Sequence, residues 1–203
     1  MMKRIGFAVL LVLIFSAVTS AIGVDYFIGT SWHSGNPAKI GQYYISDPDW
    51  ITRPFEDAPY FSARIRWGGH EIEWVHDKIY LKEDLPGIEG FNVSDGYNLL
   101  LYNVPQVWGG IEARIGLGVV VAHPEGIIDG HYIGSLGSAS WRTGGIGGQV
   151  ALGYRKPIWQ GLSVMAEAKL TTGFLHADYP SPIDSINIPL TGRHVLLGIG
   201  YDF

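Results

Sequence analysis

Two neighbouring stretches of the chain alternate strictly between charged and apolar positions. Arg64 and Arg66 alternate with apolar residues in the stretch 63–67, and two glutamates alternate with Ile72 and Trp74 in the stretch 71–74. Successive side chains of a strand point to opposite faces, so each stretch is predicted to be a strand with one charged and one apolar face. The glycines at 68–69 predict a tight turn between them. We expect the apolar face of this hairpin to meet lipid and the charged face to line a closed barrel.

Segments of about ten residues with a similar alternation recur along the chain and are separated by turn residues. Eight of them are predicted as strands, at about 23–32, 59–68, 70–81, 91–103, 109–122, 146–156, 162–173 and 192–203. The connections alternate between long and short, with Pro105 marking one short turn and 157–161 another. This pattern predicts an all-β fold: an eight-stranded antiparallel transmembrane β-barrel with long extracellular loops and short periplasmic turns.

The last predicted strand supports this architecture. Val195, Leu197, Ile199 and Tyr201 share one face, and the strand ends on the aromatic Phe203. The segment resembles the C-terminal signal that the outer-membrane barrel assembly machinery recognises. We therefore expect that machinery as a partner during biogenesis and the bacterial outer membrane as the location.

The first residues indicate export. Lys3 and Arg4 precede an apolar run from Ile5 to Phe15, and small residues follow as far as Ala21. The run is shorter than the ~20 residues of a spanning helix, which favours a signal peptide. The sequence thus predicts a signal peptide at residues 1–21 and a single outer-membrane barrel domain at residues 22–203.

Charge and cysteine content exclude several classes. Without Lys3 and Arg4 the chain has 12 basic and 19 acidic residues, so we expect no nucleic-acid partner. The chain has no Cys, which excludes disulfides and thiolate metal sites. The charges predicted to face inward are nearly balanced, which favours a salt-bridged interior over an open pore. They are Asp25, Glu71, Glu73, Glu112, Glu167 and Asp202, with Arg64, Arg66, Arg114, Arg155 and Lys169.

A second group of polar residues lies near the predicted outer ends of the third, fourth and fifth strands. Because strands adjacent in sequence are neighbours in a barrel, these side chains are expected to meet. Such a group suits either a divalent metal ion or acid–base chemistry. Strand parity places its two histidines on apolar faces, so they either face the lipid headgroups or are turned by a bulge. The group comprises His76, Asp77, Lys78, Asp95, Asn98, His123 and Glu125.

Three stretches of the chain, 71–80, 94–100 and 116–125, resemble the lipid A oxidase family of outer-membrane barrels. The matching positions are Glu73, His76, Lys78, Tyr80, Asp95, Gly96, Asn98, His123 and Glu125. The sequence departs from the family pattern at Pro124, which lies inside the His-x-Glu motif where the family has a proline before the histidine. The loop at 34–57 and about the last 50 residues match only as a generic barrel.

The resemblance implies oxygen-dependent oxidation of the proximal glucosamine of lipid A to an aminogluconate unit. It implies Glu73, His76, Lys78, Asp95 and Asn98 as catalytic residues. It also allows a divalent metal held by His123 and Glu125 together with His76. The implied partner is the lipopolysaccharide of the outer membrane.

Two other functions stay open at the level of sequence. A non-enzymatic structural or adhesion barrel would use its loop aromatics, Tyr43, Tyr44, Trp50, Tyr132 and Trp141, for partner contact, although these residues also suit an interfacial girdle. A lipid A deacylase needs a serine and a histidine on one face, whereas the adjacent His33 and Ser34 point to opposite faces of a strand. The deacylase is therefore the least favoured. A porin is excluded, because eight strands leave no aqueous channel.

Overall fold

The computed structural model describes residues 22–56, 59–134 and 141–203, so the predicted signal peptide lies outside the described residues. No helix in the described ranges is long and apolar enough to cross a membrane.

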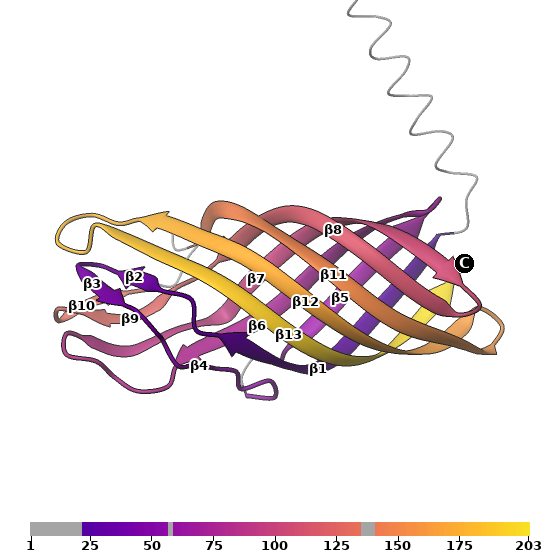
Figure 1. Cartoon of the computed structure of the whole chain (residues 1–203), viewed down its shortest axis with the longest axis horizontal. Helices are drawn as coiled ribbons and strands as arrows, with labels where there is room; N and C mark the ends of the chain where they lie inside the picture. Colours follow the sequence, from indigo (N-terminus) through magenta and orange to yellow (C-terminus); the bar gives the residue numbers. More distant parts are fainter. Residues whose placement is uncertain (1–21, 57–58, 135–140) are drawn as a thin grey trace, which may run out of the picture.

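Eight long antiparallel strands close into a ring, as the sequence predicts (Figure 1). They are β1 (Gly23–Ser34), β5 (Phe61–Trp67), β6 (His70–Leu81), β7 (Ile88–Trp108), β8 (Ile111–Ala122), β11 (Arg142–Trp159), β12 (Leu162–Asp178) and β13 (Ser185–Asp202). Each strand pairs with the next of these along the chain, and β13 pairs with β1 to close the ring. The register of the closing pair sets Gly23 opposite Asp202, so both ends of the barrel domain lie at the same end of the ring.

Short and long connections lie at opposite ends of the ring. The short turns at 68–69, 109–110 and 160–161 lie at the end that carries the chain termini, here called the terminal end. The other end, here called the loop end, carries the short strands that the described residues form within the long connections (Figure 1). These are β2 (Ala38–Ile40), β3 (Tyr43–Ile45), β4 (Trp50–Ile51), β9 (Glu125–Ile128) and β10 (His131–Ile133).

Several predicted strand limits are wrong, because the strands extend further than the sequence pattern indicates. Pro105 lies inside β7, opposite Arg114, and the turn falls at 109–110. Beyond Asn103, β7 pairs only with β8, and a proline is tolerated at such an edge. Likewise β11 continues past Pro157 to Trp159, and β12 and β13 extend at the loop end to Asp178 and Ser185.

The outward face of the ring is an apolar belt. Ile65, Ile72, Leu117 and Leu197 point outward with 45–74% of their surface exposed. Large aromatic residues lie at both edges of the belt, Trp32 and Trp74 toward the loop end and Trp108, Trp159 and Phe203 toward the terminal end. Exposed apolar side chains bordered by aromatic girdles are typical of a barrel surface that faces lipid.

The interior near the terminal end is filled by one network of ion pairs that contains every charged residue predicted to face inward. Arg64 contacts Glu167 at 3.0 Å, and Asp25 accepts from Arg66 at 3.0 Å and from Arg155 at 2.8 Å. Arg114 contacts Glu71 at 3.0 Å, and Lys169 pairs with Glu73. Pairing of this kind compensates the cost of burying charge, which is several kcal/mol for each isolated ion.

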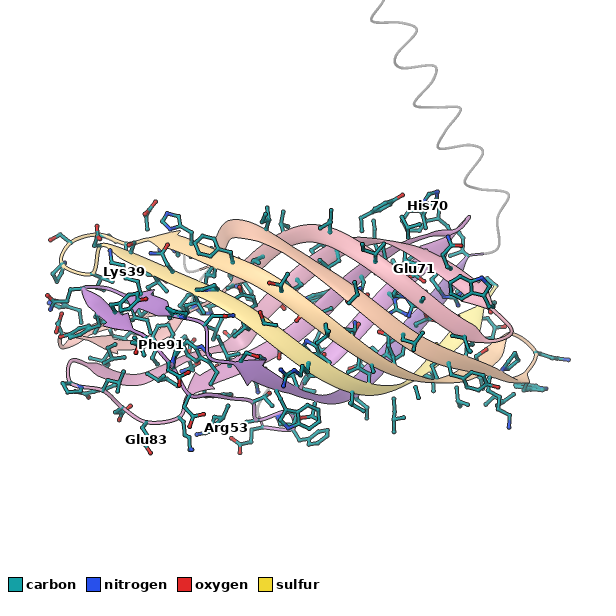
Figure 2. The ribbon with its side chains drawn as sticks, viewed as in Figure 1. Lys39, Arg53, His70, Glu71, Glu83 and Phe91 are labelled. Carbon is teal, nitrogen blue, oxygen red and sulfur yellow. The ribbon has the colours of Figure 1, made fainter. Side chains whose placement is uncertain are left out.

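The interior toward the loop end contains an apolar core and a buried polar cluster. In that cluster Asp77, which was expected at the rim, accepts from Ser31 at 2.7 Å and lies 2.9 Å from His33 Nε2. Ile40, Ile79, Ile88 and Ile186 of the apolar core are fully buried, and Phe91 packs in the same core. Figure 2 shows Phe91 at the loop end and Glu71 toward the terminal end, so the two kinds of interior follow one another along the barrel. The lumen is therefore filled by ion pairs in one half, and by an apolar core together with the Ser31–His33–Asp77 cluster in the other.

Candidate functional site

Polar side chains replace apolar ones at the loop-end edge of the belt on three adjacent strands. On β6 the outward row Ile72 and Trp74 continues with His76, and on β7 the outward residue beyond Leu100 is Asn98. His76 lies directly opposite Asn98, and Asn98 lies opposite Val121 of β8. His123 follows two positions after Val121. We call this region the rim site.

The first part of the rim site is an imidazole–amide pair under an aromatic cover. His76 Nδ1 lies 2.9 Å from Asn98 Oδ1, and Trp74 Nε1 donates to the same oxygen at 2.7 Å. The ring of His76 stacks on Phe61 with centroids 5.0 Å apart and meets Trp74 edge-on. Only 4% of His76 is exposed, so this histidine is held rigidly against the outer surface of the barrel.

These contacts assign the protonation of the imidazole. The Asn98 amide nitrogen donates to the Gly96 carbonyl at 3.1 Å, so the Asn98 oxygen is the atom that faces His76. Because that oxygen only accepts, His76 Nδ1 donates, and the neutral ring keeps its lone pair on Nε2. Nε2 is buried and has no hydrogen-bond partner within the described ranges. Its lone pair is therefore not used by any contact of these residues.

A backbone irregularity in β7 shapes both parts of the rim site. The β6–β7 register passes from Asp77 opposite Tyr97 to Ile79 opposite Val93, so three residues of β7 oppose one of β6. Gly96 lies in this bulge with φ of +116°, and a Cβ there would lie 2.5 Å from His76 Nδ1. The bulge therefore follows His76 and does not turn it: His76 stays on the outward face, and the bulge exposes Asp95.

The second part of the rim site is a histidine between two carboxylates. His123 Nδ1 lies 2.9 Å from an Asp95 oxygen and 3.7 Å from a Glu125 oxygen, and one ligand atom from each residue falls within 4.8 Å of the others. His123 is buried beside Trp141, with ring centroids 5.5 Å apart, and its Nε2 has no partner in the structure as described. Burial, and then the Asp95 carboxylate, raise the pKa of Glu125, while His123 lowers it. A carboxylate–imidazole set of this composition suits a divalent cation.

The structure does not bring every predicted residue to this place. Glu73 points into the barrel, where it accepts from Arg64 at 3.1 Å and Asn103 at 2.8 Å and pairs with Lys169, so it lies outside the rim site. Lys78 donates to the backbone carbonyl of Glu56, beneath the connection between β1 and β5. The group that could hold a metal ion contains Asp95 with His123 and Glu125, where the resemblance had implied His76.

Sequence reasoning missed the aromatic cover of the rim site. Phe61 lies directly opposite His76, but it was not singled out because this pairing depends on the register of β5 against β6. Trp74 was identified only as an apolar strand residue, although its position two residues before His76 already placed both on one face. Trp141 reaches His123 from a distant connection, for which the sequence carries no signal.

No protein-family model matches the sequence, and a comparison with curated proteins gives no significant match. Among solved structures, Neisserial surface protein A gives a TM-score of 0.43 at 11% identity, covering 91% of this chain and 97% of that one. Ail, the attachment invasion locus protein of Yersinia pestis in complex with the heparin analogue sucrose octasulfate, gives 0.40 at 12% identity, with 91% and 97% coverage. The outer membrane protein OprG from Pseudomonas aeruginosa gives 0.35 at 12% identity, with 91% and 94% coverage.

The location follows from the protein's own surface. Each of the eight strands pairs with a neighbour on both sides, so the ring is closed, and its outward face is an apolar belt between aromatic girdles. The charged residues that point inward are paired with one another inside the ring. Such a barrel belongs in the bacterial outer membrane.

Proposed function

We propose that this outer-membrane barrel modifies lipid A at the rim site, with the chemistry of a lipid A oxidase. The observation that carries the proposal is the His76–Asn98 pair, a buried imidazole with an unused Nε2 at the edge of the apolar belt. Barrels of this class keep their short turns and termini in the periplasm, so the loop end faces outward. The rim site then lies at the level of the outer-leaflet headgroups, where the glucosamines of lipid A lie.

The proposed reaction begins at C1 of the proximal glucosamine in its free hemiacetal form. This carbon and its hydroxyl together lose two electrons and two protons to O₂, which gives a lactone and H₂O₂. Water then opens the lactone to the aminogluconate acid, so the product gains one oxygen atom. His76 Nε2 is the group that accepts the hydroxyl proton. Asn98 fixes the tautomer that makes this possible.

The second part of the rim site supports the same chemistry. Asp95, His123 and Glu125 would hold a divalent cation, since their ligand atoms lie within 4.8 Å of one another. A redox-active metal held by these residues would supply a path for the two electrons to O₂. Glu73 and Lys78 have no part in this proposal, because their contacts lie elsewhere.

Mass spectrometry of lipid A tests the proposal directly. Cells with and without the protein are grown in air and without oxygen, and the lipid A of each culture is compared. An oxygen-dependent gain of one oxygen atom on the proximal glucosamine is the expected result. Loss of an acyl chain would identify a deacylase instead. Unchanged lipid A in cells that carry the folded protein in the outer membrane would refute the proposed enzymatic function.

Two substitutions then test the rim site itself. His76→Ala and His123→Ala should each lower the yield of oxidised lipid A by roughly 100-fold or more, as loss of a proton-transfer group or ligand does. His176→Ala is the matched control, because His176 is an exposed loop-end histidine whose side chain lies 2.6 Å from Asn187 and 3.3 Å from Asp178. Heat-modifiable migration on gels shows that each variant is folded. Full activity in both rim variants would place the chemistry elsewhere.

One observation favours the adhesion alternative. Tyr44 and Tyr132 lie in short strands at the loop end with 73% and 64% of their surface exposed, although an apolar core lies directly beneath them. Exposed tyrosines on a rigid support suit contact with a glycan or a protein. If lipid A is unchanged by the protein, adhesion of cells that carry Tyr44→Ser and Tyr132→Ser together becomes the measurement of choice.

A further inference from the structure

A charged residue, Arg193, interrupts the apolar belt on the side of the barrel formed by β12, β13 and β1. The outward row of β13 contains Tyr201, Ile199, Leu197 and Val195, and Arg193 is the next outward position. It lies directly opposite Trp32 of β1 and Leu170 of β12, both of which are exposed on the same face. Within the described residues its guanidinium has no hydrogen bond or ion pair.

The position of Arg193 along the barrel limits what it can contact. An outward cation costs about 2–4 kcal/mol at the bilayer midplane and little near the interface. The belt continues from Arg193 toward the terminal end, so Arg193 lies at its outer edge, where its long stem reaches the headgroups. The exposed indole of Trp32 beside it marks the same interface.

The surface on either side of Arg193 is polar toward the loop end and apolar toward the terminal end. The next outward position of β13 is Thr191, opposite Ser34 of β1 and Thr172 of β12, which places three hydroxyls in a row. On the other side lies a groove of about 590 Å³, lined by Trp32, Val150, Leu152, Leu170, Arg193 and Val195. A cation therefore lies between a row of hydroxyls and an apolar groove.

We propose that Arg193 binds a phosphate of lipid A, with an acyl chain of the same molecule in the groove. A guanidinium without a partner recognises phosphate by charge-assisted hydrogen bonds, and the groove requires a chain that is apolar along its length. The hydroxyl row and the Trp32 indole match a sugar headgroup better than a glycerol. These features select a phosphorylated glycolipid of the outer leaflet.

This lipid site is separate from the rim site. Arg193 lies on β13 and His76 on β6, and β1 and β5 stand between these strands in the ring. The proposal rests on the outer-membrane location and not on the oxidase chemistry. The site would hold a lipid at the barrel surface whether or not the rim site is catalytic, so each hypothesis fails independently of the other.

Native mass spectrometry of the full chain in detergent micelles tests the lipid site. The probes are bisphosphorylated lipid A, dephosphorylated lipid A and phosphatidylglycerol. Arg193→Gln should weaken retention of bisphosphorylated lipid A about tenfold, the usual effect of removing a hydrogen bond to a charged group. Arg193→Lys should restore part of the affinity, and dephosphorylated lipid A should bind the unsubstituted protein as weakly as bisphosphorylated lipid A binds Arg193→Gln.

Lys156→Gln is the matched control, because Lys156 is an exposed outward cation of β11 near the terminal end. It should leave lipid A retention unchanged. Trp32→Leu keeps the groove apolar and should reduce the preference for lipid A over phosphatidylglycerol. Equal retention by Arg193→Gln and the unsubstituted protein would overturn the proposal, as would equal loss in Lys156→Gln or equal retention of phosphatidylglycerol. Heat-modifiable migration confirms that each variant is folded.

Discussion

At the scale of single residues, the rim site depends on groups whose roles are set by one or two neighbours. Asn98 accepts from both His76 and Trp74, which fixes the His76 tautomer and leaves Nε2 with its lone pair. Gly96 makes room for this arrangement, because any side chain there would collide with the imidazole. Small changes at these positions are therefore expected to have large effects on activity and small effects on the barrel.

Gly96→Ala tests this expectation. The added Cβ would lie 2.5 Å from His76 Nδ1, so the imidazole and Asn98 must separate, and lipid A oxidation should fall by at least about tenfold. Gly90→Ala is the matched control in the same strand, since Gly90 also has a positive φ but has nothing within 4 Å of its Cβ position. The φ of Gly90, +59°, lies in the left-handed region that alanine can adopt, whereas the +116° of Gly96 favours glycine, so Gly96→Ala adds backbone strain as well as the collision. Equal lipid A oxidation by Gly96→Ala and Gly90→Ala would mean that the His76–Asn98 contact is not needed for activity.

The cation group makes a prediction about pH. Burial and Asp95 raise the pKa of Glu125, and a cation requires the ionised carboxylate and the neutral imidazole of His123. Protons therefore compete with the cation for the Glu125 carboxylate at a higher pH than they would at an ordinary glutamate. The affinity for the cation should fall as the pH falls. Calorimetric titration with Mn²⁺ between pH 8 and pH 5 measures this. In Glu125→Gln, binding should be weak at every pH, and a flat affinity in the unsubstituted protein would contradict the site.

At the scale of elements, the alternating side chains of β6 contribute to two surfaces, the inner wall of the barrel and its outer face. The β6 residues Glu71 and Glu73 point into the ion-pair network, while Ile72, Trp74 and His76 point outward. Sequence reasoning placed Glu73 in the interior by parity and in the catalytic set by resemblance, and the structure supports the interior position. The bulge of β7 then adds Asp95 to the outward side without changing the register below it.

Glu73→Gln separates the two roles of that glutamate. It removes the charge that pairs with Lys169 and Arg64 inside the barrel, and disruption of a buried network of this kind costs about 3–5 kcal/mol. The midpoint of urea unfolding in lipid vesicles should fall, while oxidation by the remaining folded protein should persist. Asp49→Asn, which breaks an exposed pair with Lys82, should leave the midpoint unchanged. Loss of activity without loss of stability would return Glu73 to the catalytic set.

At the scale of the whole molecule, the barrel is closed along its length. Ion pairs fill the half near the terminal end, and an apolar core with the buried Ser31–His33–Asp77 cluster fills the half near the loop end. The short strands at the loop end pair with the ends of β6, β7 and β13, so the connections extend the ring and pack over it. The chemistry of this protein is therefore expected on its outer surface and not in its lumen.

A filled lumen predicts the absence of ion conductance. Planar bilayers that contain the purified protein should show no steady single-channel steps, because paired side chains leave no continuous water path. Substitution of His76 or Arg193, both on the outer surface, should not change this result. Conductance of porin size in the unsubstituted protein would show that the interior is open in the membrane.

The sequence by itself determined the features that depend on local geometry. A strand has a period of two, so alternation alone identified eight strands, their inward charges and their lipid-facing belt. Strand ends were less well predicted, because prolines such as Pro105 read as turns although an unpaired edge tolerates them. His76 and His123 were both identified as candidate site residues, but strand alternation does not predict which side chains surround them.

Only the tertiary structure decided which side chains meet. The approach of Phe61 to His76, of Asp95 to His123 and of Trp32 to Arg193 depends on the register between strands and on one bulge. Register is fixed by the whole ring, since a shift of one residue would exchange the belt for the interior. The physical reason is the distance along the chain over which each feature is set. Alternation is a property of a single strand, whereas the rim site and the lipid site form only where neighbouring strands pair.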